Sequence, residues 1–73
     1  MSPAKDYRAL LGATIRKYRK RAHLTLETLA EKSELHPNFR GRVERGEEYI
    51  SLTALRRIAQ SLKIRIRDLV ADL

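Results

Sequence analysis

The stretch between residues 25 and 46 restricts the fold more than any other part of this 73-residue chain. Its apolar side chains recur at helical spacing in two short runs, and a proline stands at the start of the second run. Thr25 is a favourable N-cap, Pro37 suits the first position of a helix, and Gly46 can end one in the left-handed conformation. The sequence therefore predicts two short helices joined by a three-residue turn, the second of them over residues 37–45.

The remainder of the chain has helical periodicity as well, and no stretch alternates for long enough to indicate a strand. Ser51 can cap a helix whose apolar residues recur every three or four positions. No repeat, linker or low-complexity tract interrupts the series, and a chain of this length builds a single domain. We therefore expect one all-α domain over residues 1–73, with five helices and a central helix-turn-helix at residues 25–46. The expected helices cover residues 6–22, 25–33, 37–45, 51–62 and 65–73.

The charge of the chain is strongly positive, because 16 Lys and Arg residues stand against 9 Asp and Glu residues, a formal net charge of +7. Residues 1–46 carry most of this excess. The positive electrostatic field of these residues favours a polyanionic partner. No stretch approaches the roughly 20 apolar residues of a membrane span, and the first residues lack the apolar core of a signal peptide. We expect a cytoplasmic protein that binds no membrane.

No residue pattern in the chain indicates catalysis. The two histidines, His23 and His36, stand at expected helix boundaries without the spacing of metal ligands, and there is no cysteine. The three glycines form no phosphate-binding loop, and no nucleophile motif accompanies the serines and acidic residues. We therefore expect no catalytic residue, no metal ion, no cofactor and no small-molecule substrate, and we expect the chain not to be an enzyme.

The second short helix has an apolar side and a polar side. In a helix-turn-helix, this helix enters the major groove of DNA while the helix before it braces it across the phosphates. An Asn side chain matches adenine and an Arg guanidinium matches guanine, and each good pair discriminates by about 1–3 kcal/mol. Asn38 and Arg42 are therefore candidates for base contact; the alternative is that both are ordinary solvated side chains. At about 100° per residue, Leu35, Phe39 and Val43 fall on the apolar side, and Pro37, Asn38, Gly41, Arg42 and Arg45 fall on the polar side.

Three motifs follow one another along the chain: Leu24-Thr25-x-x-x-Leu29-Ala30-Glu31-Lys32-Ser33, then Val43-Glu44-Arg45-Gly46, then Leu55-x-x-Ile58-Ala59-x-x-Leu62. In this order and spacing they resemble the phage-repressor-like (XRE) helix-turn-helix family, and the resemblance covers residues 8–71. Within the family, three features are most similar to controller proteins of restriction-modification systems. These are Leu35-His36 just before the predicted helix 37–45, Gly41 in the middle of that helix, and Glu44-Arg45-Gly46-Glu47 at its end.

The resemblance implies a role for most of the residues singled out above. It makes Glu44 the partner of Arg19 in an ion pair that holds the recognition helix against the first helix. It makes Thr25 the cap of a helix end that faces a DNA phosphate. It also implies a homodimer with its recognition helices about one DNA turn apart, and with Arg65, Ile66 and Leu69 in the dimer interface. The expected DNA contacts are Thr25, His36, Pro37, Asn38, Arg40, Gly41, Arg42, Arg45 and Tyr49; the last of these could instead contact the partner subunit.

The sequence departs from the family pattern at several positions. Leu26 stands where a phosphate-contacting Gln is common, and Arg40 stands where an aliphatic core residue is usual. Arg40 either extends past Phe39 toward phosphate or lowers stability. Glu47 and Glu48 would repel a phosphate unless Arg45 neutralises them. Residues that disfavour the left-handed conformation replace the glycines that often follow the helices, so these turns could differ from the family form: His23, Glu34 and Lys63.

Together these features predict a sequence-specific transcriptional regulator that binds double-stranded DNA as a homodimer on a near-palindromic operator, with a restriction-modification controller as a narrower reading. The alternative from another class is an antitoxin-type module, whose main task is to bind a protein and whose DNA binding is secondary. Nucleic-acid packaging without sequence preference is a third reading, which the acidic residues on the basic face disfavour.

Overall fold

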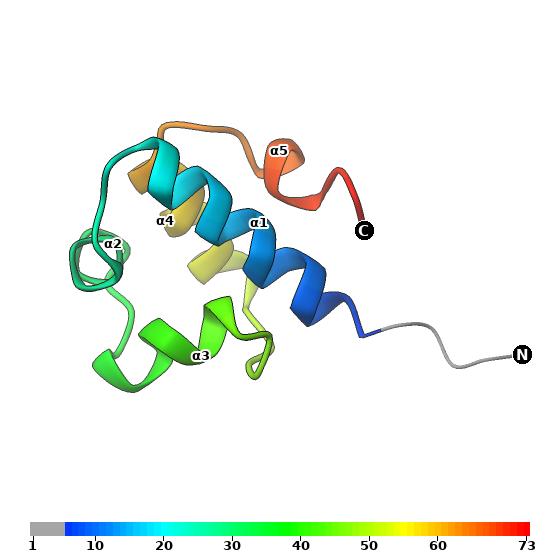
Figure 1. Cartoon of the computed structure of the whole chain (residues 1–73), viewed down its shortest axis with the longest axis horizontal. Helices are drawn as coiled ribbons and strands as arrows, with labels where there is room; N and C mark the ends of the chain where they lie inside the picture. The colour runs from blue at the N-terminus through cyan, green and yellow to red at the C-terminus, as the bar shows by residue number, and fades with distance from the viewer. Residues whose placement is uncertain (1–5) are drawn as a thin grey trace, which may run out of the picture.

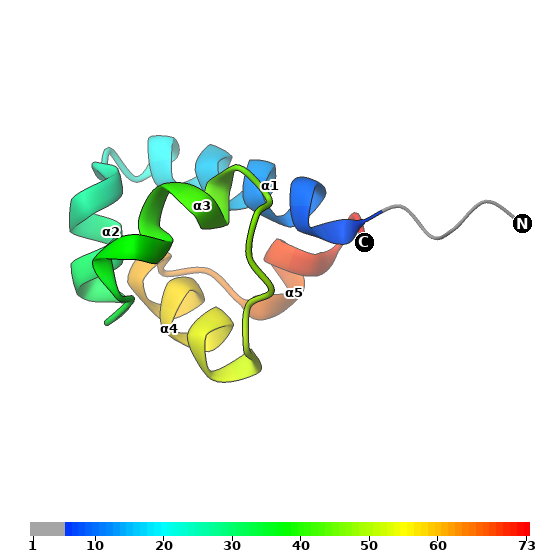
Figure 2. The same ribbon diagram turned by 90° about the horizontal axis from the view of Figure 1, so that it is seen from below.

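The computed structural model describes residues 6–73, and its secondary structure over that range is entirely helical. It contains α1 (Tyr7–Arg21), α2 (Leu26–Lys32), the short 3-10 helix η1 (Pro37–Phe39), α3 (Arg40–Glu44), α4 (Leu52–Leu62) and α5 (Ile66–Val70). The long α1 runs across the molecule and contacts α3 on one side and α5 on the other, while α2 packs on α3 and α4 (Figure 1). Seen from the side of α3, α3 crosses in front of α1 and α4 lies beneath (Figure 2). The expected all-α class with five α-helices is confirmed.

The helices begin where the sequence provides a capping side chain. The Thr25 hydroxyl accepts a hydrogen bond from the Thr28 amide at 3.0 Å, and the Ser51 hydroxyl accepts one from the Ala54 amide at 3.1 Å. Each bond satisfies an amide that has no partner within its own helix. The predicted starts of α2 and α4 are therefore confirmed.

The third helical segment is less regular than predicted. It begins as a 3-10 turn at Pro37–Phe39 and becomes an α-helix only over Arg40–Glu44. The His36 ring nitrogen Nδ1 accepts a hydrogen bond from the Asn38 amide at 3.2 Å, while Phe39 offers no side-chain cap to the α-helical part. A tight 3-10 turn is a common form for such a helix start.

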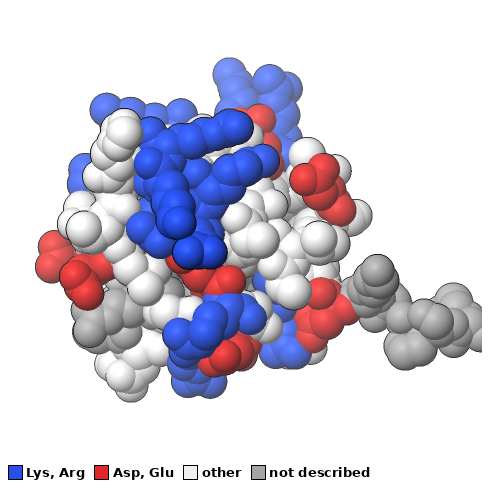
Figure 3. All heavy atoms as spheres, viewed as in Figure 1, with Lys and Arg blue, Asp and Glu red and all other residues white. Residues whose placement is uncertain are grey.

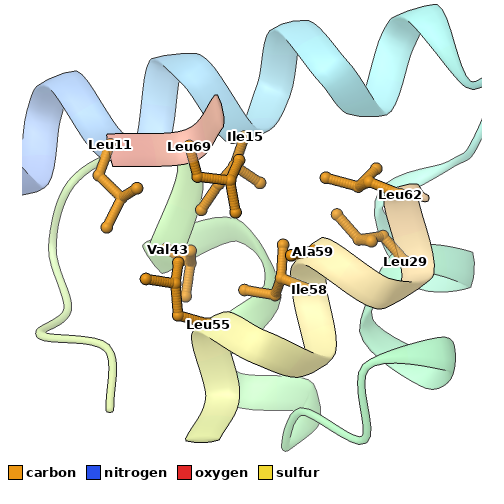
Figure 4. Packing of buried hydrophobic residues seen from close by; sticks show 9 residues of the cluster. All are labelled: Leu11, Ile15, Leu29, Val43, Leu55, Ile58, Ala59, Leu62 and Leu69. Carbon is orange, nitrogen blue, oxygen red and sulfur yellow. The ribbon is translucent and has the colours of Figure 1, made fainter. Parts of the chain in front are cut away.

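One hydrophobic core joins all the helices. Its members come from the apolar stripe of each helix and converge between α1 and α4 (Figure 4). The burial of this apolar surface is the main favourable contribution to folding. Ser33 lies fully buried beside the core, where its hydroxyl donates to the Ser61 hydroxyl at 3.1 Å and so links α2 to α4. The core consists of Leu11, Ile15, Leu29, Val43, Leu55, Ile58, Ala59, Leu62 and Leu69.

Three turns adopt the left-handed conformation without glycine. The φ angles of His23, Glu34 and Lys63 are 58°, 56° and 57°. In each turn the amide of the next residue bonds to the carbonyl five residues before it, at 2.9–3.1 Å. These bonds satisfy carbonyls at the helix ends and so offset a left-handed cost of roughly 1–2 kcal/mol per residue. These three turns thus adopt the conformation that glycine favours, although none of the three residues is glycine.

None of the described helices is long and apolar enough to cross a membrane.

Candidate nucleic-acid interface

Residues 37–46, here called the recognition segment, approach α1 with almost no space between the two backbones. A methyl group placed on Gly12 would lie 2.5 Å from the carbonyl oxygens of both Val43 and Glu44. No side chain fits at that distance, so the absence of a Cβ at Gly12 sets how closely α1 and α3 pack. Val43 is buried in the core next to this contact. The sequence pattern did not single out Gly12 for this role.

The expected ion pair between Arg19 and Glu44 is present and largely buried. Arg19 Nε donates to Glu44 Oε2 at 2.6 Å and Nη2 donates to Oε1 at 3.1 Å. A third guanidinium nitrogen, Nη1, donates to the Leu24 carbonyl at 2.9 Å. Hydrogen bonding to Glu44 raises the pKa of Arg19 above its ordinary value despite partial burial. This pair ties α1 to the end of α3 and, through Leu24, to the turn before α2.

The opposite side of the recognition segment faces solvent and also carries paired arginines. Arg42 Nη2 lies 2.7 Å from Glu48 Oε1. Arg45 makes a two-point contact with Glu47, with Nε at 2.9 Å and Nη2 at 3.2 Å from the carboxylate oxygens. The sequence suggested Arg45 as the residue that could neutralise both glutamates, and the structure divides them between Arg42 and Arg45. Asn38 is exposed on the same face.

The apolar side of the segment is only partly buried. Val43 lies in the core and Leu35 packs against it, but Phe39 is 38% exposed and stacks edge-on with the His36 ring at 6.4 Å between centroids. Phe39 lines one surface pocket together with Leu35 and Val43, so the three residues share the predicted apolar side. The side chains of Pro37 and Arg40 lie outside the described part of the structure, so both expected DNA contacts stay predictions.

Tyr49 follows the recognition segment and packs against the start of α1. Its ring meets the Tyr7 ring edge-on at 6.2 Å, and the Arg8 guanidinium stands 4.1 Å from its centroid. A cation over an aromatic face at this distance is attractive. Arg8 also pairs with Asp6, and hydrogen bonding to Arg8 lowers the pKa of Asp6. Tyr49 was expected to contact DNA or a partner subunit, and no sequence pattern indicated Tyr7 and Arg8 as its neighbours.

A shallow basic groove of about 290 Å³ lies on α1 beside Glu44 and is here called the α1 groove. Its cationic side chains are Arg16, Lys17 and Lys20. Figure 3 shows Lys and Arg atoms gathered over α1, whereas basic and acidic atoms alternate over α3. The run of basic residues in this part of the sequence was the signal for this surface.

The expected dimer residues have different environments. Arg65 is exposed and caps α5, where its amide donates to Asp68 Oδ2 at 2.9 Å. Ile66 is half-buried. Leu69 is only 1% exposed and belongs to the core of the monomer, so its expected place in a dimer interface is wrong. The helical period turns Leu69 inward against α1 and α4, and it offers no surface to a second chain.

Across the described residues, no group of three or more His, Cys, Asp or Glu side chains could hold a metal ion.

Several known proteins are similar to this chain in sequence or in structure. The control protein C.SmaI of Serratia marcescens is 35% identical over 65 residues, which cover 89% of this chain and 77% of that protein. The solved structure of the restriction-modification controller protein C.AhdI from Aeromonas hydrophila is 36% identical with a TM-score of 0.80, covering 84% of this chain and 92% of that one. The clp gene regulator ClgR from Corynebacterium glutamicum is 31% identical with a TM-score of 0.83, covering 88% and 68%.

These likenesses confirm the expected class of protein, a DNA-binding regulator that is not an enzyme. A family model described as "Helix-turn-helix domain" matches residues 10–73, nearly the whole chain. The resemblance noted in the sequence is thus confirmed: this chain belongs to the helix-turn-helix domain family.

Proposed function

We propose that the chain is a transcriptional regulator that binds double-stranded DNA sequence-specifically, as a homodimer on a near-palindromic operator in the cytoplasm. One observation carries the proposal. The recognition segment is fixed to α1 by the Gly12 contact and the Arg19–Glu44 pair, while Asn38, Arg42 and Arg45 stand on its exposed side. A rigid helix with amide and guanidinium groups on its free face suits the major groove.

Two kinds of contact are proposed for this surface. Asn38 and Arg42 contact base edges, because their donor and acceptor patterns match adenine and guanine. The α1 groove contacts phosphates, and Thr25 and Tyr49 flank the recognition segment as further backbone contacts. Phosphate contacts set position and affinity, whereas base contacts set sequence preference. His36 acts by holding the start of the segment through its bond to the Asn38 amide.

The proposed homodimer uses the surface near α5. Arg65 is exposed and Ile66 is half-buried there, so both can meet a second chain without unfolding the first. A two-fold arrangement would place two recognition segments about 34 Å apart, one DNA turn, and would require a near-palindromic site. A chain this small also gains stability from a partner subunit.

A narrower proposal concerns the biological setting. The likeness to C.SmaI and C.AhdI favours a controller of a restriction-modification system. Neighbouring genes for an endonuclease and a methyltransferase would support this setting. A neighbouring toxin gene would instead favour the antitoxin-type alternative.

Selection of bound sequences from random duplex DNA tests the proposed function. We expect a near-palindromic site with two half-sites one turn apart. Arg42→Ala is expected to relax the preference at one position of each half-site, and Lys20→Ala, the matched control in the α1 groove, to weaken binding to all sequences alike. Equal affinity of the wild type for selected and scrambled duplexes at moderate salt would contradict the proposal.

A further inference from the structure

The recognition segment is followed at once by two glutamates, Glu47 and Glu48, which together are here called the acidic clasp. The backbone fixes their position. Gly46 adopts a left-handed φ of 75°, and the Glu47 amide then donates to the Arg42 carbonyl at 2.9 Å. This is the hydrogen bond of a tight helix ending, so the chain turns back toward the last turn of α3. The clasp is thus held beside the exposed side of the helix by the backbone.

Each glutamate of the clasp pairs with a different arginine on the exposed side of the recognition segment, here called the reading face. Glu48 forms an ion pair with Arg42, and Glu47 accepts two hydrogen bonds from Arg45. The Arg45 contact raises the pKa of that guanidinium and lowers the pKa of Glu47, so both groups are charged at neutral pH. A carboxylate presents two acceptors to a guanidinium, much as the edge of guanine or a phosphate does. The clasp therefore occupies the same donors that DNA would use.

The clasp also changes where the positive charge lies. With Arg42 and Arg45 paired to glutamates, the cationic side chains of the α1 groove form a separate basic surface, as Figure 3 shows. Phosphates of any sequence are attracted there. At the reading face, in contrast, a phosphate gains little from arginines that already hold a carboxylate, and it meets two negative charges.

We propose that the acidic clasp competes with DNA for Arg42 and Arg45. The two arginines then leave the glutamates only at DNA sites whose base edges can take the place of both carboxylates. Glu47 and Glu48 are positioning residues that raise specificity by weakening binding to random DNA. This inference rests on the proposed DNA-binding function. It also assigns a role to two acidic residues that otherwise oppose that function.

The test compares the wild type with the double variant Glu47→Gln/Glu48→Gln. The probes are a random duplex and the selected duplex, titrated at several salt concentrations. The control variant, Glu31→Gln/Asp72→Asn, makes the same change of net charge at exposed positions outside the recognition segment and the clasp. Glutamine keeps the size of the side chain and removes its charge, and circular dichroism verifies that each variant is folded.

Freeing two arginines for phosphates should steepen the slope of log affinity against log salt on the random duplex by about 1.8, which is two contacts at about 0.9 each. The double variant should therefore lose about tenfold more affinity than the wild type between about 50 and 200 mM salt. Its random-duplex affinity at low salt should rise above that of the control variant, and its preference for the selected duplex should fall.

Two outcomes would overturn the proposal. A double variant with the slope of the control variant would show that the clasp withholds no arginine from phosphates. Weaker binding to both duplexes would show that the glutamates support the arginines in the complex. The proposed function is judged separately, by whether the wild type discriminates the two duplexes, because the salt slope is measured on random DNA alone.

Discussion

The two sides of the recognition segment are held by ion pairs of the same chemistry in opposite surroundings. On the α1 side, the side chains of Arg19 and Glu44 are 14% and 9% exposed. On the solvent side, those of Arg45 and Glu47 are 60% and 50% exposed, although the geometry is similar. Removing one member of a buried pair leaves an uncompensated charge, whereas water and salt replace a lost partner at the surface. The helix is therefore fixed from one side and left free to exchange partners on the other.

The two helical glycines show the same difference. At Gly12 a Cβ would meet backbone oxygens of α3, which cannot move without moving the helix. At Gly41 it would meet the far end of the Arg45 side chain, with Nη1 at 2.6 Å, and that end can swing away. One glycine is required by packing between backbones, and the other is not. Alanine at these two positions should therefore change the stability of the protein in opposite directions.

The largest effect is expected for Gly12→Ala. Its methyl group must push α1 away from Val43 and Glu44, and overpacking of this kind destabilises by about 3 kcal/mol. Urea unfolding followed by circular dichroism measures the change. Because a 73-residue domain has little stability to lose, we expect a large fraction of the variant to be unfolded at room temperature. A loss below about 1 kcal/mol would show that the two backbones separate easily and that the α1 side is not rigid.

A smaller loss is expected for Glu44→Gln. Glutamine keeps one acceptor for Arg19 but removes the counter-charge of a largely buried guanidinium, and we expect a loss of about 2 kcal/mol in the free energy of unfolding. The control is Glu31→Gln, an exposed position on α2 that should leave stability nearly unchanged. If both variants unfold at the same urea concentration, the pair does not fix the recognition segment.

The features that local patterns specify were predictable from the sequence. Capping residues fixed the starts of α2 and α4, and helical periodicity indicated all five helices. The pairing of Arg19 with Glu44 came from family resemblance, because the two residues are far apart in sequence. Leu69 was misplaced because its apolar character fits a core or an interface equally well. Only the packing of α5 on α1 and α4 decides between them.

The remaining features depend on three-dimensional placement. The contact at Gly12 arises where α1 crosses α3, and the helical periodicity of α1 does not show where that crossing lies. The available signal was a glycine between Leu11 and Ile15 on the buried stripe. The division of the glutamates between Arg42 and Arg45 depends on the turn at Gly46 and on side-chain rotamers. The left-handed turns were uncertain because residue preference opposes them, and the hydrogen bonds that stabilise them are visible only in the fold.

Gly41→Ala should act in the opposite direction from Gly12→Ala. Alanine favours the helix over glycine by up to about 1 kcal/mol. Among the described residues, the nearest atoms to its methyl group belong to the flexible end of the Arg45 side chain. We expect the urea midpoint to rise. A fall would mean that Arg45 cannot leave its place, contrary to the free exchange inferred for this side. Weaker DNA binding by a stabilised variant would support a close approach of DNA to the backbone at Gly41.

The smallest effect is expected for Glu47→Gln, measured by thermal unfolding at neutral and acidic pH. Hydrogen bonding to Arg45 lowers the pKa of Glu47, so the pair contributes stability at neutral pH that is lost as the pH falls through this lowered value. Because half or more of each side chain is exposed, water screens this contribution, and the variant should melt with the wild type at both pH values. Salt should not alter this agreement. The variant could instead lose as much stability at neutral pH as Glu44→Gln does, and none at acidic pH. That result would show that the exposed pair stabilises the fold as much as the buried pair, and the two sides of the recognition segment would no longer differ.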